Sequence, residues 1–265
     1  MAFRLKLARE MGLGAEEIAV FRRLSSPIRI QDFLTAMPSN PETEGHTCWP
    51  VRVALRRNKC HCIEAAFIAA CALMLHGRPA LIMDFQAAGD DDHVVALFRR
   101  GRNWGAISKS NSIWLRWRDP VYASPRELAM SYFHEYVKDG RKSLRRVSKP
   151  FDIGRYDPAT WVTAEEDCWD MAGELDASPH VAVVTANQAR ALRPRAVGTC
   201  APQRFCPARK RQQRIGQSGI ARLVEVRSRS GGDFRQLVQR CEIIQDPDRA
   251  SLRCHDQVIA MHTHV

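Results

Sequence analysis

The longest apolar stretch of the chain predicts a buried helix over residues 62–75. The segment CIEAAFIAACALML is rich in alanine, has no internal glycine or proline, and is apolar on nearly every side. A helix that is hydrophobic all round is normally buried. Gly77 follows where a helix end favours a residue that can adopt a positive φ, so we expect the helix to stop just before it.

Short apolar runs after this helix predict three strands in succession. A polar turn at residues 88–92 separates the first two, and the basic segment RRGR precedes the third. Apolar runs of this length between turn residues are typical of strands. The predicted strands span residues 79–85, 93–98 and 103–108.

The second and third strands are expected to form a hairpin. A two-residue turn at residues 100–101 would pair Phe98 with Asn103. The same register sets His93 opposite Ser108, so a hydroxyl would lie beside the imidazole.

Capping signals and periodicity predict further elements on either side of these strands. Ser124 followed by Pro125 is a typical helix start, and Thr163 with Glu166 forms a capping box. Residues 28–34 are apolar-periodic, but their type is left open. The remaining predictions are helices over residues 15–24, 125–138 and 163–175, a strand over 180–184 and a loop over 38–50. This order predicts an α+β domain with an antiparallel sheet.

Composition narrows the class of protein. Of the 265 residues 45% are hydrophobic, which is enough to fill a core and excludes wholesale disorder. No run reaches the ~18 apolar residues that a membrane helix needs, and the first ten residues lack the apolar block of a secretory signal. The nine cysteines are an odd number, which favours free thiols in a reducing compartment. We therefore expect a cytoplasmic protein without a membrane segment.

The last quarter of the chain differs in composition from the rest. From residue 197 onward it holds 12 basic residues, 11 of them arginine, against 6 acidic ones, and so carries +6 of the net charge of +11. Turn formers, glutamine and arginine recur there with little periodicity. We expect a folded domain over residues 1–196 and a basic, largely irregular tail over 197–265.

The candidate chemistry lies where Cys62 and His93 fall in this pattern. Cys62 occupies the first turn of the buried helix, where unpaired N–H groups and the helix dipole stabilise a thiolate. His93 opens the second strand, near solvent at the edge of the sheet, where an imidazole can take a thiol proton. Ser108, with Asn111 as the next candidate, would bond the second ring nitrogen and fix its tautomer. Glu64 is explained as a first-turn acid that the helix dipole favours.

Residues 62–111 resemble the transglutaminase-like superfamily, a branch of the papain-like cysteine enzymes. The resemblance lies in CIEAAFIAACALMLHGRPALIMDF, DDDHVVALF and NWGAISKSN, which set a helix-start cysteine before a strand histidine and an aromatic-glycine strand. It implies that Cys62 is the nucleophile and His93 the base. The third member in that family is an aspartate, whereas Ser108 stands at this position here. A neutral hydroxyl stabilises an imidazolium less well than a carboxylate does.

The resemblance also implies a fold and an activity. The fold is a papain-like core in which a buried helix carrying the cysteine packs on an antiparallel sheet carrying the histidine. The activity is thiol-based acyl chemistry on a peptide, a protein or an amide-containing small molecule, with water or an amine as acceptor and no cofactor or metal. The alternative is a catalytically silent domain that binds a peptide or protein in the same cleft. The sequence leaves the acceptor, the substrate and the oligomeric state open.

Two competing functions have weaker support. His46, Cys48, Cys60 and Cys62 are ligand types that zinc accepts, but the CxC spacing is tight and residues 47–59 contain no glycine to help the chain turn. The pI of about 9.5 would suit a nucleic acid. Aromatic residues do not interleave with the basic ones and no nucleic-acid motif is present, which argues against that partner.

Overall fold

The computed structural model describes residues 2–43, 45–194, 241–244 and 251–254. The chain divides into two units, Met1–Gln203 and Arg204–Val265. In the second unit the description is limited to two antiparallel strands, β10 (Cys241–Ile244) and β11 (Ser251–Cys254). The prediction of an irregular tail otherwise lies outside the described residues.

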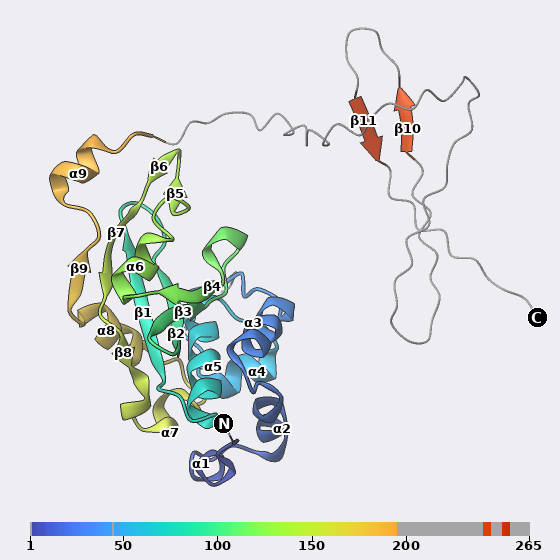
Figure 1. The fold of residues 1–265 in the computed structure, drawn as a ribbon. Helices are drawn as coiled ribbons and strands as arrows, with labels where there is room; N and C mark the ends of the chain where they lie inside the picture. The colour runs from blue at the N-terminus through green and yellow to red at the C-terminus, as the bar shows by residue number, and fades with distance from the viewer. Residues whose placement is uncertain (1, 44, 195–240, 245–250, 255–265) are drawn as a thin grey trace, which may run out of the picture. The chain divides into compact units, whose positions relative to one another are not determined.

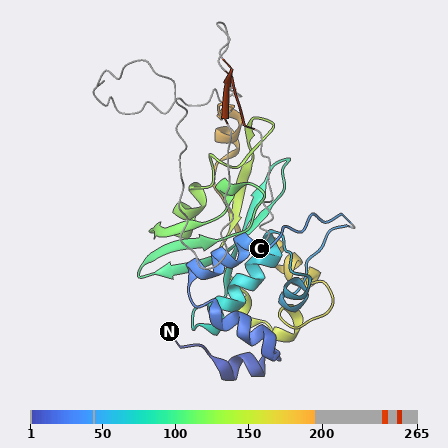
Figure 2. The same ribbon diagram turned by 90° about the vertical axis from the view of Figure 1, so that its right-hand side faces the viewer.

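The first unit is an α+β domain with helices on both faces of an antiparallel sheet (Figures 1 and 2). The strand order is β4-β3-β2-β1-β7-β9, with β8 also paired to β1, and β5 and β6 form a separate pair. The strands are β1 (Leu81–Ala87), β2 (His93–Arg100), β3 (Asn103–Ile107), β4 (Arg118–Tyr122), β5 (Val137–Lys138), β6 (Arg141–Lys142), β7 (Leu144–Ser148), β8 (Phe151–Asp152) and β9 (His180–Ala182). The helices are α1 (Leu5–Glu10), α2 (Ala15–Arg23), α3 (Pro27–Ala36), α4 (Val51–Arg57), α5 (Cys62–Leu75), α6 (Pro125–Met130), α7 (Pro158–Trp161), α8 (Trp169–Ala177) and α9 (Ala186–Ala191), with 3-10 turns η1 (Ile113–Leu115) and η2 (Ile153–Arg155).

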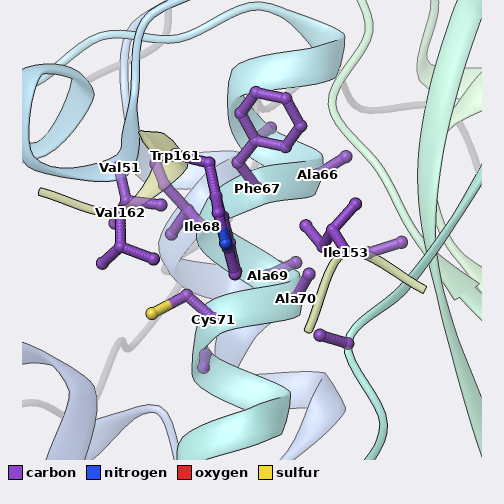
Figure 3. Packing of buried hydrophobic residues seen from close by; sticks show 14 of the residues in the cluster. Val51, Ala66, Phe67, Ile68, Ala69, Ala70, Cys71, Ile153, Trp161 and Val162 are labelled. Atoms are coloured by element: carbon purple, nitrogen blue, oxygen red, sulfur yellow. The ribbon is translucent and has the colours of Figure 1, made fainter. Parts of the chain in front are cut away.

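Helix α5 is the centre of the larger core and spans the residues predicted for it. Ten of its side chains between Ala65 and Leu75, all but Met74, are buried, since helices α1, α3 and α4 and strand β2 surround it. Figure 3 shows Phe67 and Trp161 packed beside it, with ring centroids 6.2 Å apart in an edge-on arrangement. Gly77 takes a φ of 78°, as the sequence predicts for the end of this helix. The core therefore fixes where the helix begins, and so fixes the position of Cys62.

The β2–β3 hairpin forms, but the predicted register is wrong by two residues. Arg100 pairs with Asn103, so Gly101 and Arg102 make the turn, and Phe98 pairs with Gly105. Gly101 has a φ of 61°, which suits the first central position of a tight hairpin turn. A shift of two residues keeps each side chain on its predicted face.

Two predicted helices begin or end elsewhere. The helix predicted over 125–138 ends at Met130, where the Ser131 hydroxyl donates to the Leu128 carbonyl at 2.6 Å; its later aromatic residues pack on the sheet from turns instead. The helix predicted from residue 163 begins at Trp169. The residues before it bind helix α4, because Arg52 donates to the Thr163 carbonyl at 3.3 Å. Tertiary partners outcompete the local capping signals at both places.

No helix in the described ranges is long and apolar enough to cross a membrane.

A buried ion pair fastens β9 to the sheet. The Nε2 atom of His180 lies 3.1 Å from a carboxylate oxygen of Asp84, and both side chains are 2% exposed. The Nδ1 atom of His180 donates to the Ser178 carbonyl at 2.6 Å, which orients the ring so that Nε2 faces Asp84. Burial raises the pKa of Asp84, while the hydrogen bond from His180 opposes that rise.

Changing His180 to Ala is expected to lower the free energy of unfolding by about 3 kcal/mol, because a buried carboxylate loses its partner. Arg56→Ala is the matched control, since Arg56 and Glu165 are paired at 2.7 Å but are 58% and 59% exposed. Breaking that exposed pair should cost much less, because water screens the two charges. Urea unfolding of the two variants measures the difference, and equal losses would contradict the importance of the buried pair.

Candidate active site

Cys62 begins α5 and is half-buried. The first turn of a helix has N–H groups without intrahelical acceptors, and these favour an anion. The other free cysteines in the described part of the chain are buried: Cys48, Cys60, Cys71 and Cys168. Among these five residues, Cys62 is the one that is partly exposed.

His93 lies at the start of β2 as predicted, but it is 4% exposed rather than open to solvent. Its Nε2 atom lies 2.6 Å from the Ser108 Oγ and 3.2 Å from the Leu115 carbonyl. The Ser108 hydroxyl itself donates to that carbonyl at 3.1 Å, so its oxygen is left to accept from Nε2–H. The proton of the neutral ring is therefore on Nε2, and Nδ1 remains for the thiol.

Ser108 reaches the imidazole although the two residues are not opposite each other in the hairpin. Its position is held from α3: the Ser108 N–H donates to Gln31 Oε1 at 3.0 Å, and Gln31 Nε2 donates back to the Ser108 carbonyl at 2.9 Å. Lys109 donates to the last carbonyls of that helix, at Leu34 and Met37. The segment whose type the sequence left open is thus a helix that positions the third polar residue.

Asn111 does not share this arrangement. It is exposed in the bend before η1, and the imidazole contacts described for His93 go to Ser108 and Leu115. Of the two candidates for the third residue, the structure brings only Ser108 to the ring.

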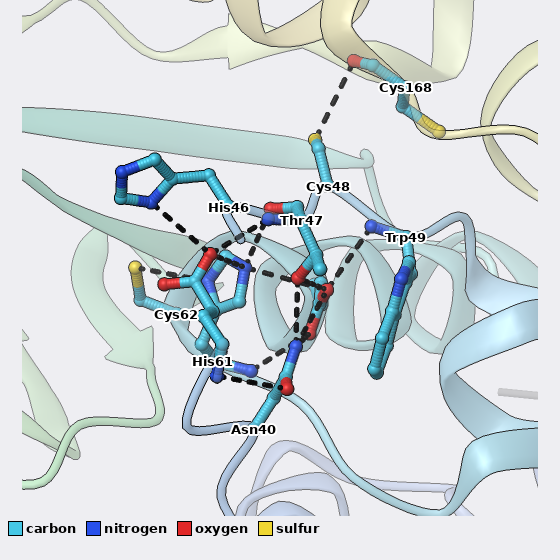
Figure 4. A network of polar contacts seen from close by, with 10 residues as sticks. Asn40, His46, Thr47, Cys48, Trp49, His61, Cys62 and Cys168 are labelled. Atoms are coloured by element: carbon cyan, nitrogen blue, oxygen red, sulfur yellow. Dashed lines mark hydrogen bonds and ion pairs between the residues drawn. The ribbon is translucent and has the colours of Figure 1, made fainter. Parts of the chain in front are cut away.

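Sequence reasoning missed His61, which lies directly before the nucleophile candidate. Its Nδ1 atom is 3.8 Å from the Cys62 sulfur, within hydrogen-bond range for sulfur (Figure 4). Its Nε2 atom donates to the Thr47 carbonyl at 2.8 Å. The available signal was the dipeptide itself, because a residue at the N-cap of a helix lies beside the first turn.

Glu64 is the second missed residue, and it is fully buried. It accepts hydrogen bonds from the Thr47 hydroxyl at 2.8 Å, the Trp49 N–H at 3.2 Å and the His61 N–H at 2.9 Å. The Asn40 amide lies 3.4 Å away, and His61 Nε2 also lies 3.4 Å away (Figure 4). The helix dipole alone does not explain why a carboxylate is buried here. The carboxylate also accepts hydrogen bonds from the loop that covers the start of α5.

The electrostatics of the site favour a thiolate. Burial would raise the pKa of Cys62, but hydrogen bonds from His61 and His93 and the charges of both rings lower it to about 5. Burial would lower the pKa of His61, but the hydrogen bond and charge of Cys62, the charge of Glu64 and the Thr47 carbonyl raise it to about 9. At neutral pH the Cys62 sulfur is therefore negative and the His61 ring positive.

The four residues considered as zinc ligands do not form a metal site. Among residues 2–43 and 45–194 and the two tail strands, no group of three or more histidine, cysteine or carboxylate side chains has a geometry that would hold a metal ion. Cys48 instead donates to the Cys168 carbonyl at 3.6 Å, and burial raises the pKa of Cys60 to about 12.

No protein-family model matches the chain, and no curated protein shows significant similarity to it.

Mild alkylation at neutral pH is expected to label Cys62 at least about tenfold faster than Cys71, because the thiolate is the reactive form. Burial strongly raises the pKa of Cys71, whereas that of Cys62 is about 5. The labelling rate should rise through pH 5 and then stay level to pH 8. Peptide mass spectrometry of iodoacetamide-treated protein measures both, and a rate still climbing at pH 8 would contradict the thiolate.

Proposed function

We propose that this chain is a transglutaminase-like thiol enzyme in which Cys62 attacks the carbonyl carbon of an amide or ester. The observation that supports the proposal is that His93 interacts with both other candidates: it helps to lower the pKa of Cys62, and its Nε2 atom lies 2.6 Å from the Ser108 Oγ. A nucleophile, a base and an orienting group in this order are the requirements of covalent acyl transfer.

The steps balance as follows. Before the attack His93 Nδ1 holds the proton that Cys62 has given up, so the sulfur is a thiolate. The thiolate forms a bond to the carbonyl carbon, and the bond to the leaving nitrogen or oxygen breaks as that atom takes the proton from His93. Water or an amine then gives a proton to His93 Nδ1 and attacks the thioester, which releases Cys62 as the thiolate. The first-turn N–H groups of α5 supply donors for the developing oxyanion.

A binding role without turnover is the second candidate, and Ser108 favours it. A hydroxyl that donates to the Leu115 carbonyl holds the imidazole in place but brings no negative charge to it. A domain of this kind would bind a peptide at the Cys62 surface and leave it intact.

A p-nitrophenyl ester tests for acyl chemistry. We expect a burst of one nitrophenol per chain as Cys62 becomes acylated, followed by slower release to water, or faster release when methylamine is added. Cys62→Ser should abolish the burst, and Cys71→Ser, a buried cysteine of the same helix, should keep it. Steady turnover should fall at least about 100-fold in His93→Ala, the usual loss when a positioned base is removed.

Removing the Ser108 hydroxyl measures how much this residue contributes to turnover. Ser108→Ala should lower turnover by about tenfold, less than the loss of His93, because the Leu115 carbonyl still accepts from Nε2. A labelled thiol without any burst would favour the binding role. A burst that survives in Cys62→Ser would contradict both the role of Cys62 as nucleophile and the binding role without turnover.

A further inference from the structure

We propose that His61 is a second imidazole of the nucleophilic centre: a fixed cation that holds Cys62 as the thiolate, while His93 alone exchanges protons with the substrate. This inference rests on the proposed function and deepens it. Its geometric basis is the 3.8 Å contact between His61 Nδ1 and the Cys62 sulfur.

Both ring nitrogens of His61 are committed. Nε2 faces the Thr47 carbonyl at 2.8 Å, and a carbonyl only accepts, so this nitrogen carries a proton. Nδ1 faces the sulfur, and in the imidazolium it donates there. A ring bound at both ends has no nitrogen left for a leaving group or a water molecule, which separates its role from that of His93.

The surroundings of His61 favour its charged form. Two carboxylates face Nε2, Glu64 at 3.4 Å and Glu42 at 3.6 Å, and the ring is 19% exposed. At such distances unit charges attract each other more strongly near a protein surface than in bulk water, because the effective dielectric constant is lower there. Glu64 is itself held by Thr47 and Trp49, so the cation is fixed by the same loop that covers the helix start.

Other titratable groups also face this centre and belong to its pH response. They come from α5, from the loop before it, from β2 and from the turns after α6. They are Glu42, Glu64, Cys60, His93 and Tyr136.

In the reaction His61 keeps its two protons throughout. His93 holds the proton that Cys62 has given up and passes it to the leaving group, while the thiolate sulfur forms a bond to carbon. When the thioester forms, the negative charge beside His61 disappears. When the thioester is cleaved, the returning thiolate regains that partner, so His61 favours release of the acyl group.

The test compares His61→Gln with His93→Ala. Thiolate absorbance at 240 nm, taken as wild type minus Cys62→Ser, gives the titration midpoint of Cys62 without any acyl substrate. We expect the midpoint to rise by about one unit or more in His61→Gln, and toward the ordinary thiol value in the double variant. A His61→Gln midpoint equal to that of the wild type overturns the proposal, whether or not an acyl activity exists.

Turnover of the p-nitrophenyl ester against pH separates the two imidazoles. In His61→Gln the acid limb should move to higher pH, and the plateau should fall less than in His93→Ala, because His93 still carries protons. In His93→Ala the plateau should be lost at every pH. A loss of the plateau in His61→Gln as large as that in His93→Ala would make His61 a proton carrier and overturn the proposal.

A reciprocal measurement keeps the proposal testable if His61→Gln does not fold. Protein with ¹³C-labelled histidine should show an imidazole that titrates near pH 9, and this resonance should persist in His93→Ala. Its midpoint should fall by about one unit or more in Cys62→Ser, because the sulfur contributes the largest part of the upward shift. An imidazole unaffected by Cys62→Ser, or the absence of one near pH 9, overturns the assignment.

Discussion

A single buried carboxylate organises the end of the domain where the chemistry is proposed. Glu64 has no exposed surface, yet it accepts from the loop at Thr47 and Trp49 and from the backbone of His61. A charge taken out of water is tolerated only when its hydrogen bonds are replaced, so loop and helix start must keep one relative position. The placement of the thiol and of the ring before it follows from that requirement.

The second support comes from helix α3, which packs against α5 and β3. Gln31 on α3 pairs with both backbone groups of Ser108, and Ser108 in turn holds His93. The two imidazoles are therefore positioned by separate parts of the chain, one by the loop before α5 and one by α3. A disturbance in either support would affect one ring and leave the other in place.

Local signals in the sequence predicted an element correctly where one physical cause dominates. The apolar, alanine-rich stretch could only be a buried helix, so α5 was predicted residue for residue, and the strands after it were close. Predictions from local signals were wrong where two causes compete. The capping box at Thr163 does not start a helix, because Thr163 binds Arg52 instead. The β2–β3 turn forms one residue later than predicted, because Gly101 suits the first central position of the turn. Cys62, His93 and Ser108 were singled out from their order along the chain, and the structure brings Ser108 to His93. The roles of His61 and Glu64 were missed because they depend on a loop whose path no periodicity encodes.

Cys62 is the one cysteine among the five described that is not buried, and this has a consequence for oxidation. A partly exposed thiolate reacts with peroxide far faster than the neutral thiols of Cys48, Cys60, Cys71 and Cys168, whose burial keeps them protonated. Among the described residues oxidation would thus begin at Cys62 as a sulfenic acid, and the four buried cysteines are poorly placed to form a disulfide with it. The same electrostatics that prepare Cys62 for a carbonyl make it the redox-sensitive position of the domain.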